Sequence, residues 1–454
     1  MLKTCPYCWR SVLTANQSAT AVNIAREVAG RLRERKQIEI AIAAAIQQTE
    51  FPRSIDWQDY GVAQGYAGLA IMCSYLNACF PNEDWDVVGH SLLEIAVRNA
   101  ERHPFLPAGM CLGLGGLAFA SWCLSKGGKR YRKLQATLEE LLLPQTAVLA
   151  NTLAEQKEDV SISQFDLISG LSSIGAYLLC RKEVPEVAET LKVVLRSLVE
   201  LTREEGGLPR WYTPAPLIGD EELQRLYPNG YLNCGLAHGI PGPLGLLSLA
   251  HVSNIIVDGM EEAIHRAAKW LLQHSLRDTW GINWPTMVQV EVDGTVAATS
   301  CMEVVSPFEL SRTAWCYGSP GLARALWFAG KALGHAEYCE TAIAAMEAMY
   351  RRPLNVRRID SPTFCHGVAG LLQISLRFAH DTGLPQFTEA ARRLSEQLLS
   401  LYDPDTLLGY YSLELGGKRI DQPGLLDGAA GVIMVLLAAA TSVEPTWDRM
   451  YLLS

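Results

Sequence analysis

The sequence has few charged residues, no excess of positive charge and no long apolar run. Only 19% of its 454 residues are charged while 49% are apolar, so the chain can bury a large core and is not intrinsically disordered. The 39 basic residues are outnumbered by 48 acidic ones, which is the wrong balance for gathering the phosphates of a nucleic acid. We therefore expect a folded protein that does not bind nucleic acid.

No segment has the composition of a secretory signal or the length of a membrane span. The stretch from Met1 to Arg10 lacks an apolar core, and the longest late apolar run, from Gly431 to Ala440, covers about half a span. The sequence predicts a cytoplasmic protein with no transmembrane segment. Any association with a membrane is expected to be peripheral and to go through partner proteins.

Cysteines are too sparse and too irregularly spaced for a disulfide scaffold. There are twelve, and several of them, such as Cys73 and Cys123, lie in apolar, helix-like segments, so we expect reduced core thiols. Cys5-Pro-Tyr-Cys8 has the spacing of a redox motif, but no strand or βαβ pattern surrounds it. Only cysteines with unusual neighbours remain as functional candidates.

Glycines at positions i and i+3 recur before apolar segments along the whole chain. The pairs are Gly65/Gly68, Gly113/Gly116, Gly239/Gly242, Gly318/Gly321, Gly367/Gly370 and Gly428/Gly431, with a looser case at Gly170, where Ser173 takes the second place. We call the turn that ends at the first glycine of each pair an elbow. The first glycines are 48 to 79 residues apart, which is room for two helices and their loops. The apolar stretch after each elbow predicts an inner helix, and the amphipathic stretch that follows predicts an outer one.

Seven helical hairpins without a polar linker favour an all-α fold, a closed α/α toroid with two helix layers, formed by a single domain over residues 1–454. An open solenoid is the alternative. Residues 203–230, rich in proline, and 280–300, which read as a β-hairpin around Asp293-Gly294, are expected to be insertions at one face. The repeat places all elbows at one end of the ring.

Three elbows carry residues that bind metals or transfer protons. Cys316 and Cys365 each precede the first glycine by two positions, and His238 and His366 precede it by one. Two thiolates and one imidazole suit Zn²⁺ and leave its fourth position open, as in catalytic sites. Two alternatives are open: the cysteines can be small apolar fillers, or a cysteine and histidine can form an acyl-transfer dyad, although Cys365 and His366 are poorly placed to meet as adjacent residues.

Longer motifs around these residues resemble the lanthipeptide cyclase (LanC) family over essentially the whole chain. They are Tyr227-Pro-Asn-Gly-Tyr-Leu-Asn-Cys-Gly-Leu-Ala-His-Gly239, Arg312-Thr-Ala-Trp-Cys-Tyr-Gly-Ser-Pro-Gly321 and Cys365-His-Gly367. The chain length fits the stand-alone form of the family rather than a fused synthetase. The resemblance implies an α/α toroid that holds Zn²⁺ through Cys316, Cys365 and His366.

The same resemblance implies a substrate and a reaction. The substrate is a precursor peptide, carrying a leader, whose serines and threonines are already dehydrated to dehydroalanine and dehydrobutyrine. Michael-type addition of a cysteine thiol to these alkenes gives lanthionine or methyllanthionine thioether rings. A dehydratase and an exporter are the further expected partners. The leader is expected to dock on the enlarged rim of residues 203–230 and 280–300.

Four further residues match positions that the family uses in catalysis. His238 and Asp166 match an acid/base pair, in which Asp166 would hold the imidazole in its donor tautomer. Arg312 and Tyr317 match residues that line the site, and Arg312 would stabilise the enolate oxygen. Each has an open structural alternative: a core histidine, a helix N-cap, an ion-pair partner and a packing residue, respectively.

Three other functions remain as alternatives. Within the family, the thiol can come from glutathione. A zinc-stabilised scaffold that binds peptides without chemistry predicts a closed metal site. A toroidal glycosidase needs two rim carboxylates, for which Asp166 and Asp427 are candidates, but it leaves Cys316, Cys365 and His366 unexplained.

Overall fold

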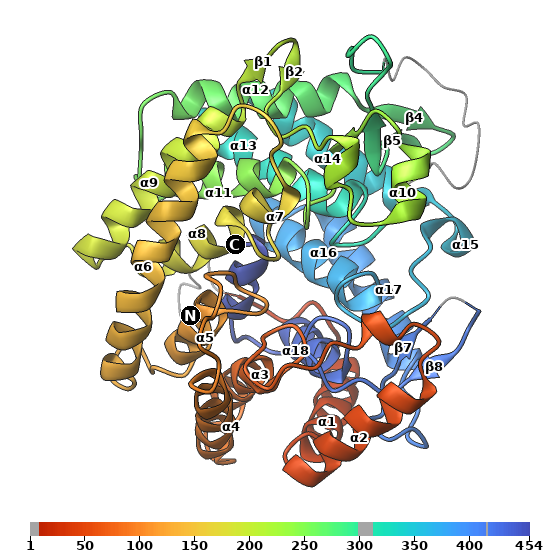
Figure 1. Cartoon of the computed structure of the whole chain (residues 1–454). Helices are drawn as coiled ribbons and strands as arrows, with labels where there is room; N and C mark the ends of the chain where they lie inside the picture. The colour runs from red at the N-terminus through yellow and green to blue at the C-terminus, as the bar shows by residue number, and fades with distance from the viewer. Residues whose placement is uncertain (1–8, 298–311, 415) are drawn as a thin grey trace, which may run out of the picture.

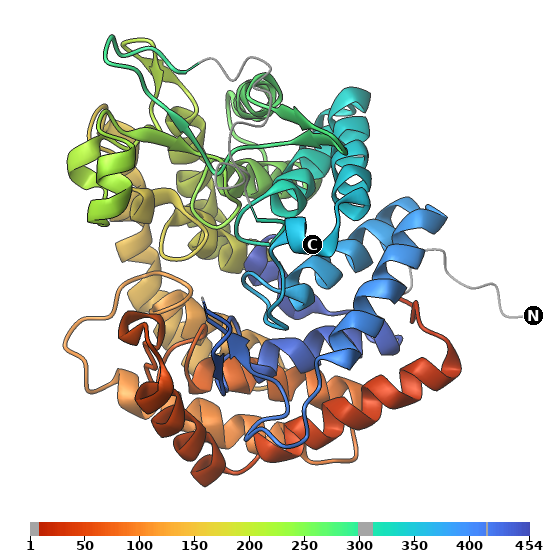
Figure 2. The same ribbon diagram turned by 90° about the vertical axis from the view of Figure 1, so that its right-hand side faces the viewer.

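Helices of two kinds alternate along the chain and form two concentric layers around one centre (Figure 1 and Figure 2). The computed structural model describes residues 9–297, 312–414 and 416–454. The inner helices are α3 (Tyr66–Cys79), α5 (Leu114–Cys123), α8 (Leu171–Cys180), α11 (Pro241–Val252), α13 (Ser319–Leu333), α16 (Val368–Thr382) and α18 (Ala429–Ala440). Each packs against the next, and α18 packs against α3, so the predicted α/α toroid is confirmed and the open solenoid was wrong.

Six outer helices each follow and pack on the inner helix before them. They are α4 (Trp85–Ala100), α6 (Arg132–Glu155), α9 (Pro185–Leu201), α12 (Met260–Gln273), α14 (Ala336–Arg351) and α17 (Pro385–Ser400). Helix α9 illustrates the amphipathic pattern. Val187, Leu191, Val194 and Leu198 are fully buried, whereas the opposite face of the helix is exposed to solvent. Among the described residues, no helix is long and apolar enough to cross a membrane.

The seventh hairpin is assembled from the two ends of the chain. Helix α1 (Ala15–Arg31) packs on α18, so the first helix of the sequence covers the last inner helix (Figure 1). Thr14 and Gln17 form a capping box that fixes the start of α1, and Val12 N–H donates to the carbonyl of Ala439 at 3.1 Å. Contacts between the chain ends therefore close the ring.

A closed circle of backbone hydrogen bonds joins the seven elbows. In each elbow the residue two places before the first glycine, here called the ring position, accepts a bond from a neighbouring elbow. The bonds are Leu426 N–H to Ala63, Val62 N–H to Cys111, Cys111 N–H to Ile168, Leu167 N–H to Ala237, Ala237 N–H to Cys316, Cys316 N–H to Cys365 and Cys365 N–H to Leu426, at 2.8 to 3.3 Å. The repeat therefore fixes every elbow relative to its neighbours.

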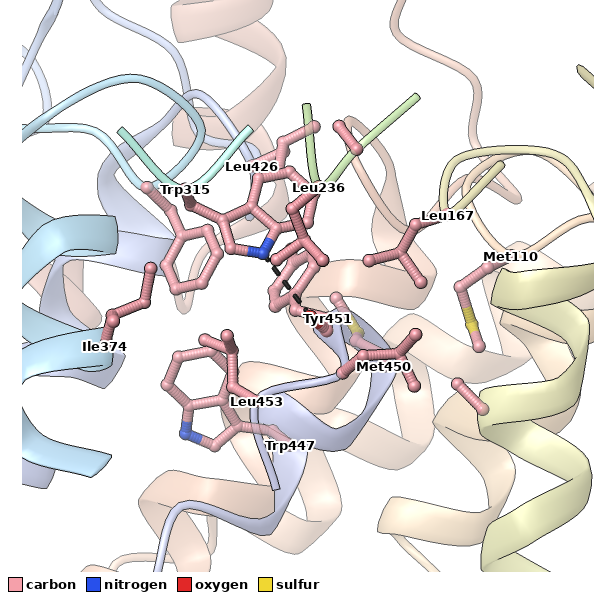
Figure 3. Close-up of a cluster of buried hydrophobic side chains, with 14 of the residues drawn as sticks. Met110, Leu167, Leu236, Trp315, Ile374, Leu426, Trp447, Met450, Tyr451 and Leu453 are labelled. Atoms are coloured by element: carbon pink, nitrogen blue, oxygen red, sulfur yellow. Dashed lines mark hydrogen bonds between the residues drawn. The ribbon is translucent and has the colours of Figure 1, made fainter. Parts of the chain in front are cut away.

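An apolar layer lies directly beneath this circle. The residue three places before each first glycine is apolar and at most 2% exposed: Val62, Met110, Leu167, Leu236, Trp315, Phe364 and Leu425. The C-terminal segment fills the centre below it, and Tyr451 stacks on Phe364. The Tyr451 carbonyl accepts a hydrogen bond from Trp315 Nε1 (Figure 3). Buried Arg324 and Arg377 hold the segment by donating to the Leu453 carbonyl and the Asp448 carboxylate. The elbows therefore lie on a layer of buried apolar side chains.

The second predicted insertion pairs with the strand that follows the first. Strand β3 (Tyr231–Asn233) follows the first and pairs antiparallel with β6 (Met287–Gln289) in the second. The turn at Asp293-Gly294 is present, closed by Glu291 N–H to the Thr295 carbonyl at 2.8 Å, while residues 298–300 lie outside the described residues. The first insertion also contains α10 (Glu221–Leu226) and the strand pair β1 (Glu204–Glu205) and β2 (Leu208–Pro209).

One further helix and two short strand pairs belong to neither helix layer. Helix α2 (Arg35–Gln48) begins in the basic run Arg31–Lys36, and most residues of its first turn are exposed. The strand pairs β4 (Leu276–Asp278) with β5 (Gly281–Asn283), and β7 (Ser412–Leu413) with β8 (Arg419–Ile420), are antiparallel. The motif Cys5-Pro-Tyr-Cys8 lies outside the described residues.

Sterics require a glycine at the second position in most of the elbows, which gives a test of the fold. A Cβ on Gly370 would lie 2.0 Å from the carbonyl oxygen of Phe364, and backbone cannot yield to it. We expect Gly370→Ala to lower the free energy of unfolding by about 3 kcal/mol. Gly245, in the middle of α11, is the matched control, because a Cβ there meets only Leu452 at 3.7 Å.

The Gly245→Ala control should be neutral, or stabilising by up to about 1 kcal/mol through reduced freedom of the unfolded chain. Urea unfolding followed by circular dichroism compares the two variants with the wild type. Equal midpoints for Gly370→Ala and Gly245→Ala would contradict the packing described for the elbows.

Candidate active site

The residues that immediately precede the first glycines lie on one rim of the ring. From the fourth elbow to the seventh they are His238, Tyr317, His366 and Asp427, and the backbone circle holds these four elbows side by side. Cys316 and Cys365 occupy ring positions in the same set. The backbone bonds bring the elbows of Cys316, Cys365, His238 and His366 to the same end of the toroid, and the shared metal site of Cys316, Cys365 and His366 stays a prediction.

Cys365, His366 and Asp427 form a compact group of metal-binding side chains. One ligand atom from each lies within 4.8 Å of the others, and each residue is partly buried. His366 Nδ1 lies 3.5 Å from Asp427 Oδ1. This Oδ1 is buried and has no hydrogen-bond partner among the described residues, so the group presents an unsatisfied acceptor.

Cys316 lies beside this group and contacts Cys365. A hydrogen bond with the Cys316 thiol, together with burial, raises the pKa of Cys365 well above its ordinary value. Burial also raises the pKa of Asp427, against the opposing charge of His366. A divalent cation at this place would lower both pKa values, because it stabilises the charged forms of the thiol and the carboxyl.

His238 is held by a buried carboxylate. Its Nδ1 lies 2.7 Å from Asp166 Oδ2, and Asp166 is only 3% exposed. The other oxygen, Oδ1, accepts from the backbone N–H groups of Ile168, Ser169 and Gly170 at 2.7 to 3.1 Å. Asp166 thus both caps the third elbow and orients the imidazole, which leaves Nε2 for exchange of a proton.

Tyr317 lies beside His238, with 6.1 Å between the two ring centroids. Its hydroxyl accepts a hydrogen bond from Asn233 Nδ2 at 3.2 Å, and burial raises the pKa of Tyr317. Asn233 in turn accepts from Gly235 N–H at 2.9 Å. Because Asn233 donates to the phenol oxygen, the phenol proton is free to point to a different acceptor.

A family model described as "Lanthionine synthetase C-like protein" matches residues 56–452. The chain belongs to the lanthionine synthetase C-like family. It is 25% identical over 429 residues to "Nisin biosynthesis protein NisC" of Lactococcus lactis subsp. lactis, covering 92% of this chain and 95% of that protein. The solved structure of "Nisin cyclase" superposes with a TM-score of 0.72 at 23% identity, over 92% of this chain and 98% of that one.

Arg312, the remaining predicted site residue, stays a prediction within this LanC-like chain. It is half-buried and borders residues 298–311, which lie outside the described residues. The next residue, Thr313, is fixed by N–H donation to the Arg357 carbonyl at 3.1 Å. The backbone is therefore held in place next to Arg312, which lies four residues before Cys316.

Two residues beside the LanC-like site were missed or misread from the sequence. Asp427 was considered only as a glycosidase carboxylate, yet it lies against His366 in the metal-binding group. Its position immediately before Gly428 is the same as that of His366 before Gly367, so the elbow alignment contained the signal. Asn233 lies six residues before Gly239, and the spacing of the glycine pairs did not point to it.

Proposed function

We propose that this chain is a zinc-dependent cyclase that adds cysteine thiols to dehydroalanine and dehydrobutyrine within one dehydrated precursor peptide, forming (methyl)lanthionine rings. One observation carries the proposal. The metal-binding group of Cys365, His366 and Asp427 and the His238–Asp166 pair lie on elbows that the backbone circle holds together. The similarity to the nisin cyclase supports the substrate class.

The donor set fits a zinc ion. Cys316, Cys365 and His366 offer two thiols and one imidazole, which are the ligands that zinc favours over calcium or magnesium. The orphaned oxygen of Asp427 is a further sign of a site built around a cation. When bound, zinc deprotonates a coordinated peptide thiol and presents it as the thiolate nucleophile.

The remaining steps belong to side chains of the chain itself. The reaction places sulfur on the β-carbon and a proton on the α-carbon, so it needs neither an oxidant nor a co-reactant. His238 is proposed to donate that proton from Nε2, with Asp166 holding Nδ1–H. Tyr317 and Arg312 are proposed to line the site, with Arg312 stabilising the negative charge that develops on the amide oxygen.

Removal of the metal tests the proposed reaction. The full chain is incubated with a dehydrated, cysteine-bearing peptide, and free thiols are counted before and after treatment with a zinc chelator. We expect thiol loss without a change in peptide mass, its suppression by the chelator, and its recovery on addition of zinc. Thiol loss that does not depend on metal would contradict the mechanism.

The same assay separates the other functions. Zinc retained at one ion per chain without thiol loss would favour the peptide-binding scaffold. An increase in peptide mass by one glutathione, when glutathione is supplied, would favour intermolecular addition. Intramolecular cyclisation instead leaves the mass of the dehydrated peptide unchanged, so mass spectrometry decides between the two.

A further inference from the structure

Two residues of the fourth elbow hold the side chain of Tyr317, which belongs to the fifth. Gly235 lies against the phenol ring, because a Cβ at this position would be 2.5 Å from Tyr317 Cδ1 and Cε1 and 2.8 Å from the Cys316 carbonyl oxygen. Asn233 lies at the end of the ring, where its Nδ2 is 3.2 Å from the hydroxyl oxygen. One short segment therefore contacts the phenol both along its face and at its oxygen.

The orientation of the Asn233 amide follows from its second hydrogen bond. Asn233 is only 2% exposed, and its Oδ1 accepts from Gly235 N–H at 2.9 Å. If the amide were turned over, its NH₂ group would face that N–H, and two donors would be opposed in a buried place. Nδ2 therefore faces Tyr317 and donates to the phenol oxygen.

The backbone of Asn233 is held independently of these side-chain bonds. Asn233 is the last residue of β3, where it pairs with Met287 of β6, and its carbonyl accepts from Ile240 N–H at 3.3 Å. The amide that contacts Tyr317 thus projects from a part of the chain that is fixed on both sides.

The bond from Asn233 determines where the phenol proton of Tyr317 is directed. A hydroxyl oxygen that accepts from an amide turns its own O–H to a different group, and no acceptor for this O–H is present among the described residues. Tyr317 is partly exposed on the elbow rim, with its ring centroid 6.1 Å from that of His238. Its O–H is therefore available to a substrate bound beside His238.

We propose that Asn233 is a positioning residue, which orients the Tyr317 hydroxyl so that it donates a hydrogen bond to the amide oxygen of the dehydrated residue as sulfur adds. This inference rests on the proposed function. Tyr317 keeps its proton throughout, and the proton that reaches the α-carbon still comes from His238. No covalent bond to Tyr317 or Asn233 forms or breaks.

Orientation matters because negative charge develops on the amide oxygen only in the transition state. A donor that already points to this place needs no reorganisation when the charge appears, whereas a freely rotating phenol would first have to leave other partners. Donation from the buried Asn233 amide also polarises the phenol, which makes its O–H a stronger donor.

Asn233→Asp tests the direction of the bond with little change of shape. One carboxylate oxygen still accepts from Gly235 N–H, so the turn is kept, but the other accepts from the Tyr317 O–H and draws its proton away from the substrate. We expect the kcat of cyclisation to fall about 10²-fold, the usual cost of losing one such donor. The KM for a dehydrated, cysteine-bearing peptide and the zinc content should stay at their wild-type values.

Tyr317→Phe removes the hydroxyl itself and should lower kcat by the same factor. The double variant Asn233→Asp/Tyr317→Phe should be no slower than either single variant, because both substitutions remove one and the same hydrogen bond to the substrate.

Two substitutions serve as matched controls. Asn229→Asp adds the same charge four residues before Asn233, at a residue whose carbonyl accepts from the Tyr212 hydroxyl. Tyr350→Phe removes a hydroxyl that donates to Ser375 Oγ at 2.8 Å, away from the elbows on α14. Both controls should cyclise the peptide at the wild-type rate.

Equal slowing in the two single variants without further slowing in the double variant supports the inference. A wild-type kcat in Asn233→Asp or in Tyr317→Phe overturns it, as does a double variant whose slowing is the product of the two. Loss of zinc or a raised KM in Asn233→Asp would show that Asn233 only supports the elbow, which also overturns the inference. If the wild type consumes no peptide thiol, it is the proposed function that fails, and this is seen before any variant is compared.

Discussion

Cys365→Ala is expected to remove bound zinc and to reduce cyclisation to the rate of an unactivated thiol. Cys365 lies at the centre of the candidate site, between Cys316 and the His366–Asp427 pair. An ordinary cysteine has a pKa of about 8.5 and is only a few per cent thiolate at neutral pH, so loss of activation alone slows attack about 30-fold. The peptide sulfur is then also no longer held in position by the metal, which slows the attack further.

Zinc per chain by elemental analysis, and ring formation by mass spectrometry after thiol alkylation, measure the two parts of this expectation. Cys111→Ala is a matched control, since Cys111 occupies the ring position of the second elbow and is also buried. Burial raises the pKa of Cys111 to about 12, so it stays a neutral thiol. The control should keep its zinc and its activity; equal behaviour of the two variants would contradict the assignment.

His238→Ala is expected to slow cyclisation by about 10²- to 10⁴-fold, the usual contribution of a general acid. Zinc content should stay at the wild-type level, because His238 is paired with Asp166 and lies outside the metal-binding group. His251→Ala is a suitable control at the opposite end of α11, where Nε2 lies 3.1 Å from Glu261. It should leave both the rate and the zinc content unchanged.

Asp166→Asn extends this test to the orientation of the imidazole. The amide oxygen can still accept from the three N–H groups of the third elbow, but the amide nitrogen then faces His238 Nδ1 as a donor. That arrangement favours the wrong tautomer, so we expect the rate to fall while zinc content and stability are kept. A normal rate in Asp166→Asn would show that the pair has only a structural role.

The fold was predictable because the elbows impose a steric rule on the sequence. In five of the six pairs the second glycine approaches a carbonyl of its own elbow so closely that a Cβ would not fit, as Gly370 approaches Phe364. The third elbow lacks that glycine, yet Ile168 and Leu167 join the backbone circle, because the hydrogen bonds need no particular side chain. The repeat was thus visible even where one glycine was replaced.

The parts that could not be predicted depend on contacts between distant segments. Nothing in the composition of α1 shows that it covers α18 and completes the seventh hairpin. The pairing of β3 with β6 joins the strand that follows the first insertion to the second insertion, across 54 residues from Asn233 to Met287. The approach of Asp166 to His238 was expected only from the family resemblance, because it depends on the turn that the Asp166 carboxylate caps, four residues before Gly170.

The number of sulfur atoms around the bound metal tests the central claim most directly. Zinc X-ray absorption of the full chain, alone and with a cysteine peptide that lacks a dehydrated residue, gives this number without turnover. We predict two sulfurs in the free protein and three with the peptide. Fewer than two sulfurs in the free protein, or a first shell that the peptide thiol leaves unchanged, would contradict the account.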